Sequence, residues 1–278
     1  QLLWVIVVLI PKGGGDYRGI GLLEPFWKVI EIVMDRRLNV VMFHDCLHGF
    51  PAGRGTGTAT IEAKLMQQLA FLKQTALHVI FVDLKKAYDA MDRDRCLDIL
   101  RGYGVGPKML RLIKFFWDNA ELVCRANGCF GEPFRAHRGI TQGGPLSPRI
   151  FIAMVDAIVR EWLRQVLGAE AAASGYGNRL RKLLAIFYAD DALIASRDPR
   201  LLQEAMDILV GLFECVGLRQ HVASFIVNWP IFDLCVGSER LRGTAPRQYW
   251  WEQTLDLDAA RASASVAAGD EEVGPVGD

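Results

Sequence analysis

The sequence lacks several features that would assign it to common protein classes. Its six cysteines contain no CxxC pair and lie in apolar or mixed segments, where a free thiol behaves as a small hydrophobe. The apolar run at residues 2–10 is too short for a membrane-spanning helix, which needs about 20 residues, and it has neither the basic start nor the cleavage site of a signal peptide. We therefore expect an intracellular protein, in the cytoplasm or nucleus, that is not secreted and has no membrane partner.

A strong charge of one sign is also absent, because 32 basic residues balance 32 acidic ones. Residues 1–230 hold 28 basic and 23 acidic side chains, and residues 231–278 hold four and nine. A mildly basic body permits a polyanionic partner without requiring one. The chain has 278 residues, of which 51% are apolar, so it can bury one large core or two modest ones, and wholesale disorder is excluded. Because the chain begins with Gln, we expect a fragment of a longer reading frame.

Apolar periodicity and turn residues predict a chain of mixed strands and helices. Strands are expected at residues 3–10, 17–23, 78–82, 122–125, 183–188 and 192–195, and helices at residues 25–38, 59–74, 108–119, 148–162 and 199–217. A further helix is expected to carry Cys96, Leu97 and Leu100 on one face and to end near Gly102. Ser147 is expected to cap the longest helix, with Pro148 in its first turn. Beyond residue 230 the pattern fades, and the composition of residues 259–278 predicts no stable structure.

Acidic residues follow two apolar runs of the chain. Asp190 and Asp191 interrupt the sequence LLAIFYADDALIAS, which indicates either a hairpin tip that offers carboxylates to a cation or a simple polar turn. Asp83 repeats the arrangement after the run HVIFV, although alone it could equally cap a helix. Carboxylates at the ends of neighbouring strands can converge on a pair of Mg²⁺ ions that promote phosphoryl transfer.

Two glycine-rich segments supply candidate contacts for a nucleotide. The segment TQGGPLSP lets the backbone approach a ligand closely and adds the side-chain amide of Gln142, although a loop and cap before a helix would look the same. Lys12 and Arg18 flank the first glycine-rich turn. They could hold a triphosphate, or they could belong to a solvated hairpin tip.

A short cluster of potential metal ligands stands apart from these segments. His44, Cys46 and His48 are close in sequence, but no second pair of ligands follows at the spacing of a zinc site. This pattern favours a polar loop over a zinc site.

Five short segments occur in a recognisable order. FVDLKKAYD at 81–89, QGGPLSP at 142–148 and FYADD at 187–191 resemble motifs A, B and C of reverse transcriptases. Upstream, IPKGGGDYRGIGLLEP at 10–25 and HGFPAGRGT at 48–56 resemble the fingers motifs of the group II intron and non-LTR retroelement branch. Each motif alone is weakly specific, but together they extend the resemblance over residues 5–220 and identify the chain as a member of that family.

The resemblance implies an α+β, right-hand polymerase fold with an antiparallel palm sheet and interleaved fingers of helices and strands. The implied fingers are residues 1–77 and 113–146, the second part including the motif B loop, and the implied palm is residues 78–112 and 147–229. No thumb is visible in the sequence, and residues 230–278 are expected to be a degenerate or disordered tail. The implied reaction is RNA-directed DNA synthesis with two Mg²⁺ ions, for which Mn²⁺ can substitute.

The resemblance also carries roles to individual residues. The implied metal ligands are Asp83, Asp190, Asp191 and the backbone carbonyl of Leu84. The implied nucleotide contacts are Lys12 and Arg18 at the triphosphate, Gln142 and Gly143 beneath the nucleotide and template base, and Tyr88 beneath the sugar. Tyr88 would exclude a 2′-hydroxyl, which is the group that distinguishes ribonucleotides at the sugar. The expected partners are an RNA template, a DNA or RNA primer and dNTPs.

The sequence departs from the family pattern after motif C. The family has GLxxNxxKT there, with a lysine near the leaving pyrophosphate, whereas this chain has GLRQHVASF. His221 therefore occupies the Asn position and Ser224 the Lys position. The alternative interpretation is a catalytically weak or inactive retroelement relic that binds RNA or an RNA–DNA hybrid through its basic body.

Overall fold

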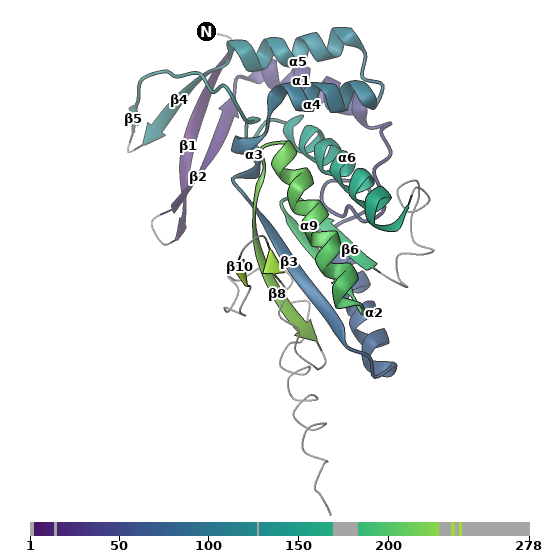
Figure 1. Ribbon diagram of the computed structural model, residues 1–278. Helices are drawn as coiled ribbons and strands as arrows, with labels where there is room; N and C mark the ends of the chain where they lie inside the picture. The colour runs from purple at the N-terminus through teal and green to yellow at the C-terminus, as the bar shows by residue number, and fades with distance from the viewer. Residues whose placement is uncertain are drawn as a thin grey trace, which may run out of the picture.

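The structure, a computed structural model, describes residues 3–13, 16–126, 128–168, 183–227, 235–236 and 239–240. Two four-stranded sheets and the helices around them organise these residues (Figure 1). Within this part of the chain, no helix is both long and apolar enough to cross a membrane.

The first sheet is built around a long N-terminal hairpin. Its strands, in the order β2-β1-β4-β5, are β2 (Asp16–Leu23), β1 (Trp4–Gly13), β4 (Glu121–Ala126) and β5 (Cys129–Phe130). β1 pairs antiparallel with β2 and parallel with β4. Trp27 of α1 (Pro25–Leu38) stacks on Phe116 of α5 (Pro107–Asn119), with ring centroids 5.0 Å apart, and the two rings share a small core with Val5 and Leu23.

The second sheet is entirely antiparallel. Its strands, in the order β6-β7-β3-β8, are β6 (Leu183–Tyr188), β7 (Asp191–Ser196), β3 (Leu77–Lys85) and β8 (Arg219–Val227). The helices packed on this sheet are α6 (Ser147–Leu167), α9 (Pro199–Cys215) and α2 (Thr56–Leu72). The remaining elements are the helices α3 (Ala87–Ala90) and α4 (Arg93–Gly102) and the paired short strands β9 (Cys235–Val236) and β10 (Glu239–Arg240).

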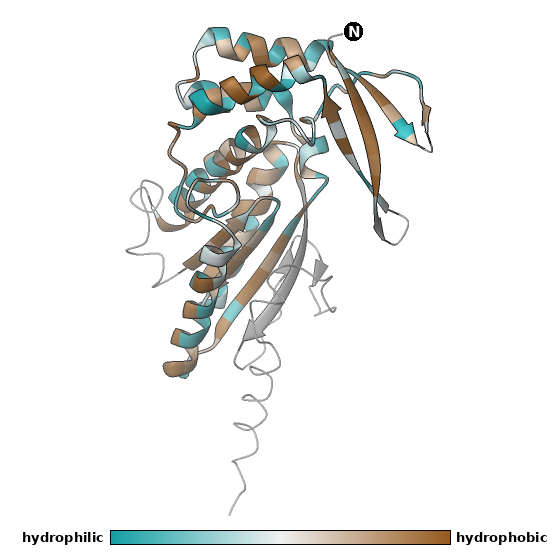
Figure 2. Cartoon of the chain, turned by 180° about the vertical axis from the view of Figure 1, so that it is seen from behind, coloured by the Kyte–Doolittle hydropathy of each residue, from teal (hydrophilic) through white to brown (hydrophobic). Residues whose placement is uncertain are grey.

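The central strand β3 is buried on both faces. Ile80 and Val82 belong to the large core that the sheet shares with α6 and α9, whereas Val79 and Phe81 belong to a smaller core shared with α2. Figure 2 shows β3 as a largely apolar strand. Two-sided burial explains why its sequence is a continuous apolar run and does not alternate with polar residues.

Most of the predicted elements are confirmed, with two differences at helix starts. The helix predicted at residues 59–74 begins at Thr56, where the Thr58 hydroxyl accepts a hydrogen bond from the Gly55 N–H at 3.0 Å. The prediction that Ser147 caps α6 is wrong, because Ser147 is its first residue and Leu146 precedes it. The Leu146 N–H instead donates to Glu31 Oε2 at 3.2 Å. The expectations for the thumb and for residues 230–278 lie outside the described residues, apart from β9 and β10.

Candidate active site

Three acidic residues lie at one end of the second sheet. Asp83 near the end of β3 lies directly opposite Asp191 at the start of β7, and directly opposed residues of an antiparallel pair project from the same face. Asp190 lies in the tight turn between β6 and β7. Its backbone carbonyl accepts a hydrogen bond from the Leu84 N–H at 2.9 Å. The strand register therefore brings together residues that are far apart in the sequence.

The donor atoms at this sheet end fit a hard divalent cation. Among the described residues, no three His, Cys, Asp or Glu side chains are gathered closely enough to hold a metal ion by themselves. Asp83, Asp190, Asp191 and the Leu84 carbonyl nevertheless supply only oxygen donors, which are the ligands that Mg²⁺ prefers.

Tyr88 lies close enough to Asp190 and Arg18 for both charges to affect its hydroxyl. Its ring stacks on Phe151 of α6, with centroids 4.6 Å apart and planes 9° from parallel. Burial raises the pKa of the Tyr88 hydroxyl, the negative charge of Asp190 raises it further, and the positive charge of Arg18 lowers it. Charges from β2 and from the acidic turn thus both act on this hydroxyl.

The glycine-rich loop before α6 is held against β2. The Gly21 N–H donates to the Gln142 carbonyl at 2.6 Å. Gly143 has φ +112°, a conformation that L side chains rarely adopt, and a Cβ on it would collide with the Gly21 carbonyl oxygen. The Gln142 side-chain amide reaches Asp89 Oδ1 at 3.4 Å. The loop that carries Gln142 and Gly143 thus contacts both β2 and the segment after Tyr88.

A family model for reverse transcriptase, described as RNA-dependent DNA polymerase, matches residues 10–222. The chain belongs to the reverse transcriptase family. The predicted family is confirmed.

The relatives of this reverse transcriptase chain include retroelement proteins. It is 23% identical over 233 residues to the transposon TX1 uncharacterized 149 kDa protein of Xenopus laevis, which covers 81% of this chain and 17% of that protein. It is 28% identical over 166 residues to a retrovirus-related Pol polyprotein from the type-1 retrotransposable element R2 of Nasonia vitripennis, which covers 58% and 15%. The chain thus spans less than a fifth of the length of these relatives.

Solved structures with a similar fold include telomerases. Telomerase of Candida tropicalis in complex with the TWJ fragment of telomeric RNA has a TM-score of 0.61 and 15% identity, over 81% of this chain and 41% of that chain. Apo telomerase of the same organism, truncated from its C-terminal domain, has a TM-score of 0.60 and 15% identity, over 84% and 52%. The predicted α+β, right-hand polymerase fold is confirmed.

Backbone hydrogen bonds join motif A of the reverse transcriptase to the segment that leads into motif B. The Ile140 N–H donates to the Tyr88 carbonyl and the Gly139 N–H to the Met91 carbonyl, both at 2.8 Å. Arg93 then donates to the Gly139 carbonyl at 2.8 Å and also reaches the carbonyls of Ala136 and Trp117. Burial lowers the pKa of Arg93. Its guanidinium fixes a loop that has no regular structure of its own.

Glu31 of α1 holds the end of the motif B loop. Its carboxylate accepts from the Leu146 N–H, and a Cβ on Gly144 would lie 2.7 Å from Glu31 Oε2. Burial raises the pKa of Glu31, and the hydrogen bond from Leu146 opposes this change. Sequence reasoning missed both Glu31 and Arg93. The signal that could have found Glu31 is its helical spacing from Trp27 and Met34, which puts all three residues on the buried face of α1.

We expect the pH dependence of stability to reveal the buried Glu31. An acid whose folded-state pKa is raised contributes stability fully below its unfolded pKa, near 4.5, and the contribution is lost as the pH rises through the folded-state pKa. The free energy of unfolding of the parent chain should therefore fall relative to that of Glu31→Gln as the pH rises above 4.5. Glu31→Ala should cost about 1–3 kcal/mol, because the Leu146 N–H loses its acceptor. Urea denaturation between pH 4 and pH 8 measures both effects, and parallel curves for the parent and Glu31→Gln would contradict the assignment.

Three sequence positions are described by their backbone alone. Lys12 lies in β1, as its place in the hairpin requires. In β8, His221 pairs directly with Asp83 and Ser224 pairs with Ile80. The side chains of these three residues lie outside the described part of the chain.

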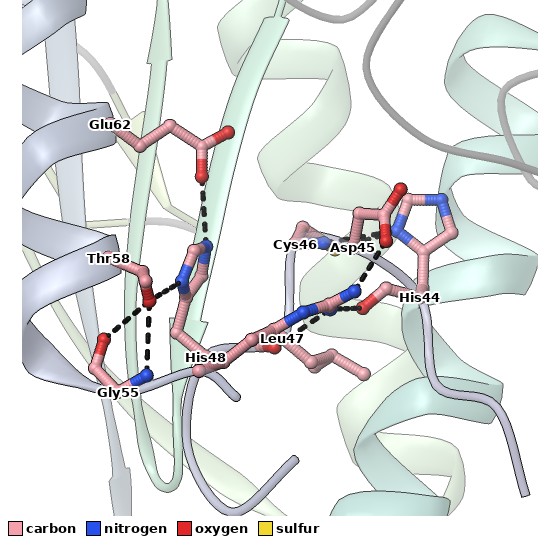
Figure 3. A network of polar contacts seen from close by, with 9 residues as sticks. His44, Asp45, Cys46, Leu47, His48, Gly55, Thr58 and Glu62 are labelled. Carbon is pink, nitrogen blue, oxygen red and sulfur yellow. Dashed lines mark hydrogen bonds and ion pairs between the residues drawn. The ribbon is translucent and has the colours of Figure 1, made fainter. Parts of the chain in front are cut away.

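The segment predicted as a polar loop lies in the interior of the molecule. His44 and His48 are each only 2% exposed, and Cys46 is fully buried. His44 Nδ1 lies 3.1 Å from Cys46 Sγ, while the two ring nitrogens of His48 are hydrogen-bonded to residues of α2 (Figure 3). The expected polar loop is confirmed, and its His and Cys side chains are buried because protein groups satisfy them.

Proposed function

We propose that this reverse transcriptase domain catalyses RNA-directed DNA synthesis. The 3′-hydroxyl of a DNA or RNA primer attacks the α-phosphate of a dNTP, a new phosphodiester bond forms, and pyrophosphate leaves. The observation that supports this function most strongly is the register of β3 and β7, which sets Asp83 opposite Asp191 and beside the turn that carries Asp190.

The acidic end of the second sheet is the proposed metal site. Asp83, Asp190, Asp191 and the Leu84 carbonyl hold two Mg²⁺ ions, or Mn²⁺ in their place. When bound, such ions favour ionisation of an attacking hydroxyl and stabilise charge on a leaving oxygen. The residues themselves contribute negative charge on a rigid sheet end, where strand pairing fixes the spacing of two of the three carboxylates.

The residues around Tyr88 form the proposed nucleotide site. Tyr88 lies beneath the sugar, where its ring, held flat on Phe151, excludes a 2′-hydroxyl. Lys12 and Arg18 contact the triphosphate, and Arg18 suits this role because its planar guanidinium forms paired bonds to phosphate oxygens. Gln142 and Gly143 lie beneath the nucleotide and the template base. The template base that pairs with the incoming nucleotide belongs to an RNA strand.

The two sheets correspond to the proposed subdomains. Residues 1–77 and 113–146, which include the first sheet, form the fingers, and residues 78–112 and 147–229, which include the second sheet, form the palm. We place the protein inside the cell, in the cytoplasm or nucleus, because its nucleotide and RNA substrates are found there.

A second candidate function is binding of RNA or an RNA–DNA hybrid without catalysis. It is favoured by the serine at position 224, where the family pattern has a lysine. Loss of a general acid near the leaving group typically lowers the rate by about 10²- to 10⁴-fold.

Incorporation of dTTP on poly(rA)/oligo(dT) with Mg²⁺ distinguishes the two functions. A polymerase extends the primer and stops when the metal is chelated. A folded chain that binds the hybrid and extends no primer would overturn the proposed enzyme and support the binding protein.

Sugar selection should depend on Tyr88. In Tyr88→Ala, the space beneath the sugar opens, so incorporation of UTP relative to dTTP should rise by about 10- to 100-fold. Single-nucleotide extension with each triphosphate measures this ratio, and thermal denaturation checks that the loss of stacking on Phe151 leaves the chain folded. An unchanged ratio in the folded variant would rule out Tyr88 as the residue that selects the sugar.

A further inference from the structure

The segment His44–Arg54, here called the brace, lies beside the strand that leads to the acidic turn. The Phe187 N–H of β6 donates to the Cys46 carbonyl, and the His48 N–H donates to the Phe187 carbonyl, both at 2.7 Å. Leu47 forms a parallel bridge with Phe187. The brace therefore extends the second sheet beyond β6, immediately before Tyr188 and the turn.

Gly49 of the brace touches the acidic turn itself. A Cβ on Gly49 would lie 2.5 Å from the Ala189 nitrogen and 3.2 Å from the Tyr188 carbonyl carbon, so the backbones are in direct contact. Ala189 has φ +53°, in the left-handed region that alanine rarely occupies. Such strained conformations persist only where the surrounding structure enforces them, and they gather at functional sites.

The brace is fixed to the palm core and to itself. The His44 N–H donates to Asp156 Oδ1 of α6 at 2.6 Å. Arg54 donates to the carbonyls of His44 at 2.7 Å and Leu47 at 3.1 Å, and forms an ion pair with Asp45 at 2.5 Å. These contacts close the segment into a compact loop on the edge of the sheet (Figure 3).

His48 fastens the brace to α2. Its Nδ1 lies 2.9 Å from Thr58 Oγ1 and its Nε2 lies 2.9 Å from Glu62 Oε2 (Figure 3). Glu62 is buried like His48, so water does not compete for this hydrogen bond. Because the same residue donates its backbone N–H to Phe187, His48 joins α2 to β6 through one short path.

We propose that the brace sets the position of the turn that carries Asp190, and that His48 is the positioning residue of this arrangement. The proposal deepens the proposed function and rests on it, because the position of Asp190 matters for metal binding. Groups that orient metal ligands typically change metal affinity by about 10- to 100-fold when they are removed.

Two glycine variants test the contact with the turn. Gly49→Ala adds a methyl group against Ala189, whereas Gly57→Ala adds one in α2, where nothing lies within 4 Å. Titration of the purified chain with Mn²⁺, followed by electron paramagnetic resonance, should show affinity reduced by about 10- to 100-fold in Gly49→Ala and unchanged affinity in Gly57→Ala. Hydrogen exchange should be faster at Phe187 in Gly49→Ala and unchanged in Gly57→Ala.

Variants of His48 and of its partner Glu62 provide the second test. His48→Leu removes both hydrogen bonds and should behave as Gly49→Ala, while Glu62→Gln keeps an acceptor for the imidazole and should stay close to the parent chain. Parent-like exchange at Phe187 and parent-like Mn²⁺ affinity in folded Gly49→Ala and His48→Leu would overturn the brace. If the parent chain binds no Mn²⁺, the proposed metal site fails; faster exchange at Phe187 would then still support the brace.

Discussion

Replacing Asp190 with Asn is expected to reduce nucleotide incorporation by about 10³-fold or more, because a ligand of the proposed metal site loses its charge. The fold should survive, since the hydrogen bond from Leu84 goes to the Asp190 backbone carbonyl, which the substitution leaves in place. Hybrid binding should persist as well, with a modest gain from the lost negative charge. Single-turnover primer extension and a filter-binding assay measure the two properties separately.

Asp207→Asn is the matched control for this loss of charge. Asp207 is an exposed residue of α9, so the same chemical change there should leave incorporation unaltered. Equal activity in Asp190→Asn and the parent chain would show that the turn between β6 and β7 takes no part in catalysis.

Loss of the Asp156 carboxylate should have the largest effect on stability. Asp156 is fully buried and accepts hydrogen bonds from the His44 N–H and from Arg160 Nε, each at 2.6 Å, and from the Tyr103 hydroxyl. Asp156→Ala leaves these donors without their acceptor, and breaking a buried pair in this way costs about 3–5 kcal/mol. Urea denaturation followed by circular dichroism measures the change.

An exposed ion pair provides the comparison. Asp98 pairs with Arg101 on the surface of α4, with both side chains more than half exposed. Asp98→Ala should denature close to the parent chain, because exposed pairs contribute little. If Asp156→Ala were as mild as Asp98→Ala, Asp156 would not hold the brace to α6.

The sequence predicted strands correctly where continuous apolar runs end at an aspartate. The run before Asp83 and the two runs around Asp190 predicted strands correctly, because burial on both faces leaves a continuous apolar pattern. The motif order then assigned these acids to one metal site, and that assignment stays a prediction. Their register could not be predicted, because the pairing of Asp83 with Asp191 depends on contacts between distant parts of the chain.

Buried polar residues were the main features that the sequence concealed. Glu31 and Asp156 are buried and Arg93 is half-buried, all on helices, where a charged residue usually faces solvent. Each has a main-chain partner far away in the sequence. His48 was likewise expected in a polar loop, because its partners on α2 become neighbours only through the fold. Helical periodicity identifies an apolar face but does not reveal which polar group satisfies a charge within it.

The hydrogen bond from Ile140 to the Tyr88 carbonyl has a consequence for copying accuracy. It joins the residue proposed to inspect the sugar to the segment that leads into the loop proposed to lie under the base. Arg93 fixes the same segment through the Gly139 carbonyl. A change that loosens this junction should raise misincorporation of ribonucleotides and mispairing of bases together, so the two kinds of copying error should vary in parallel across variants.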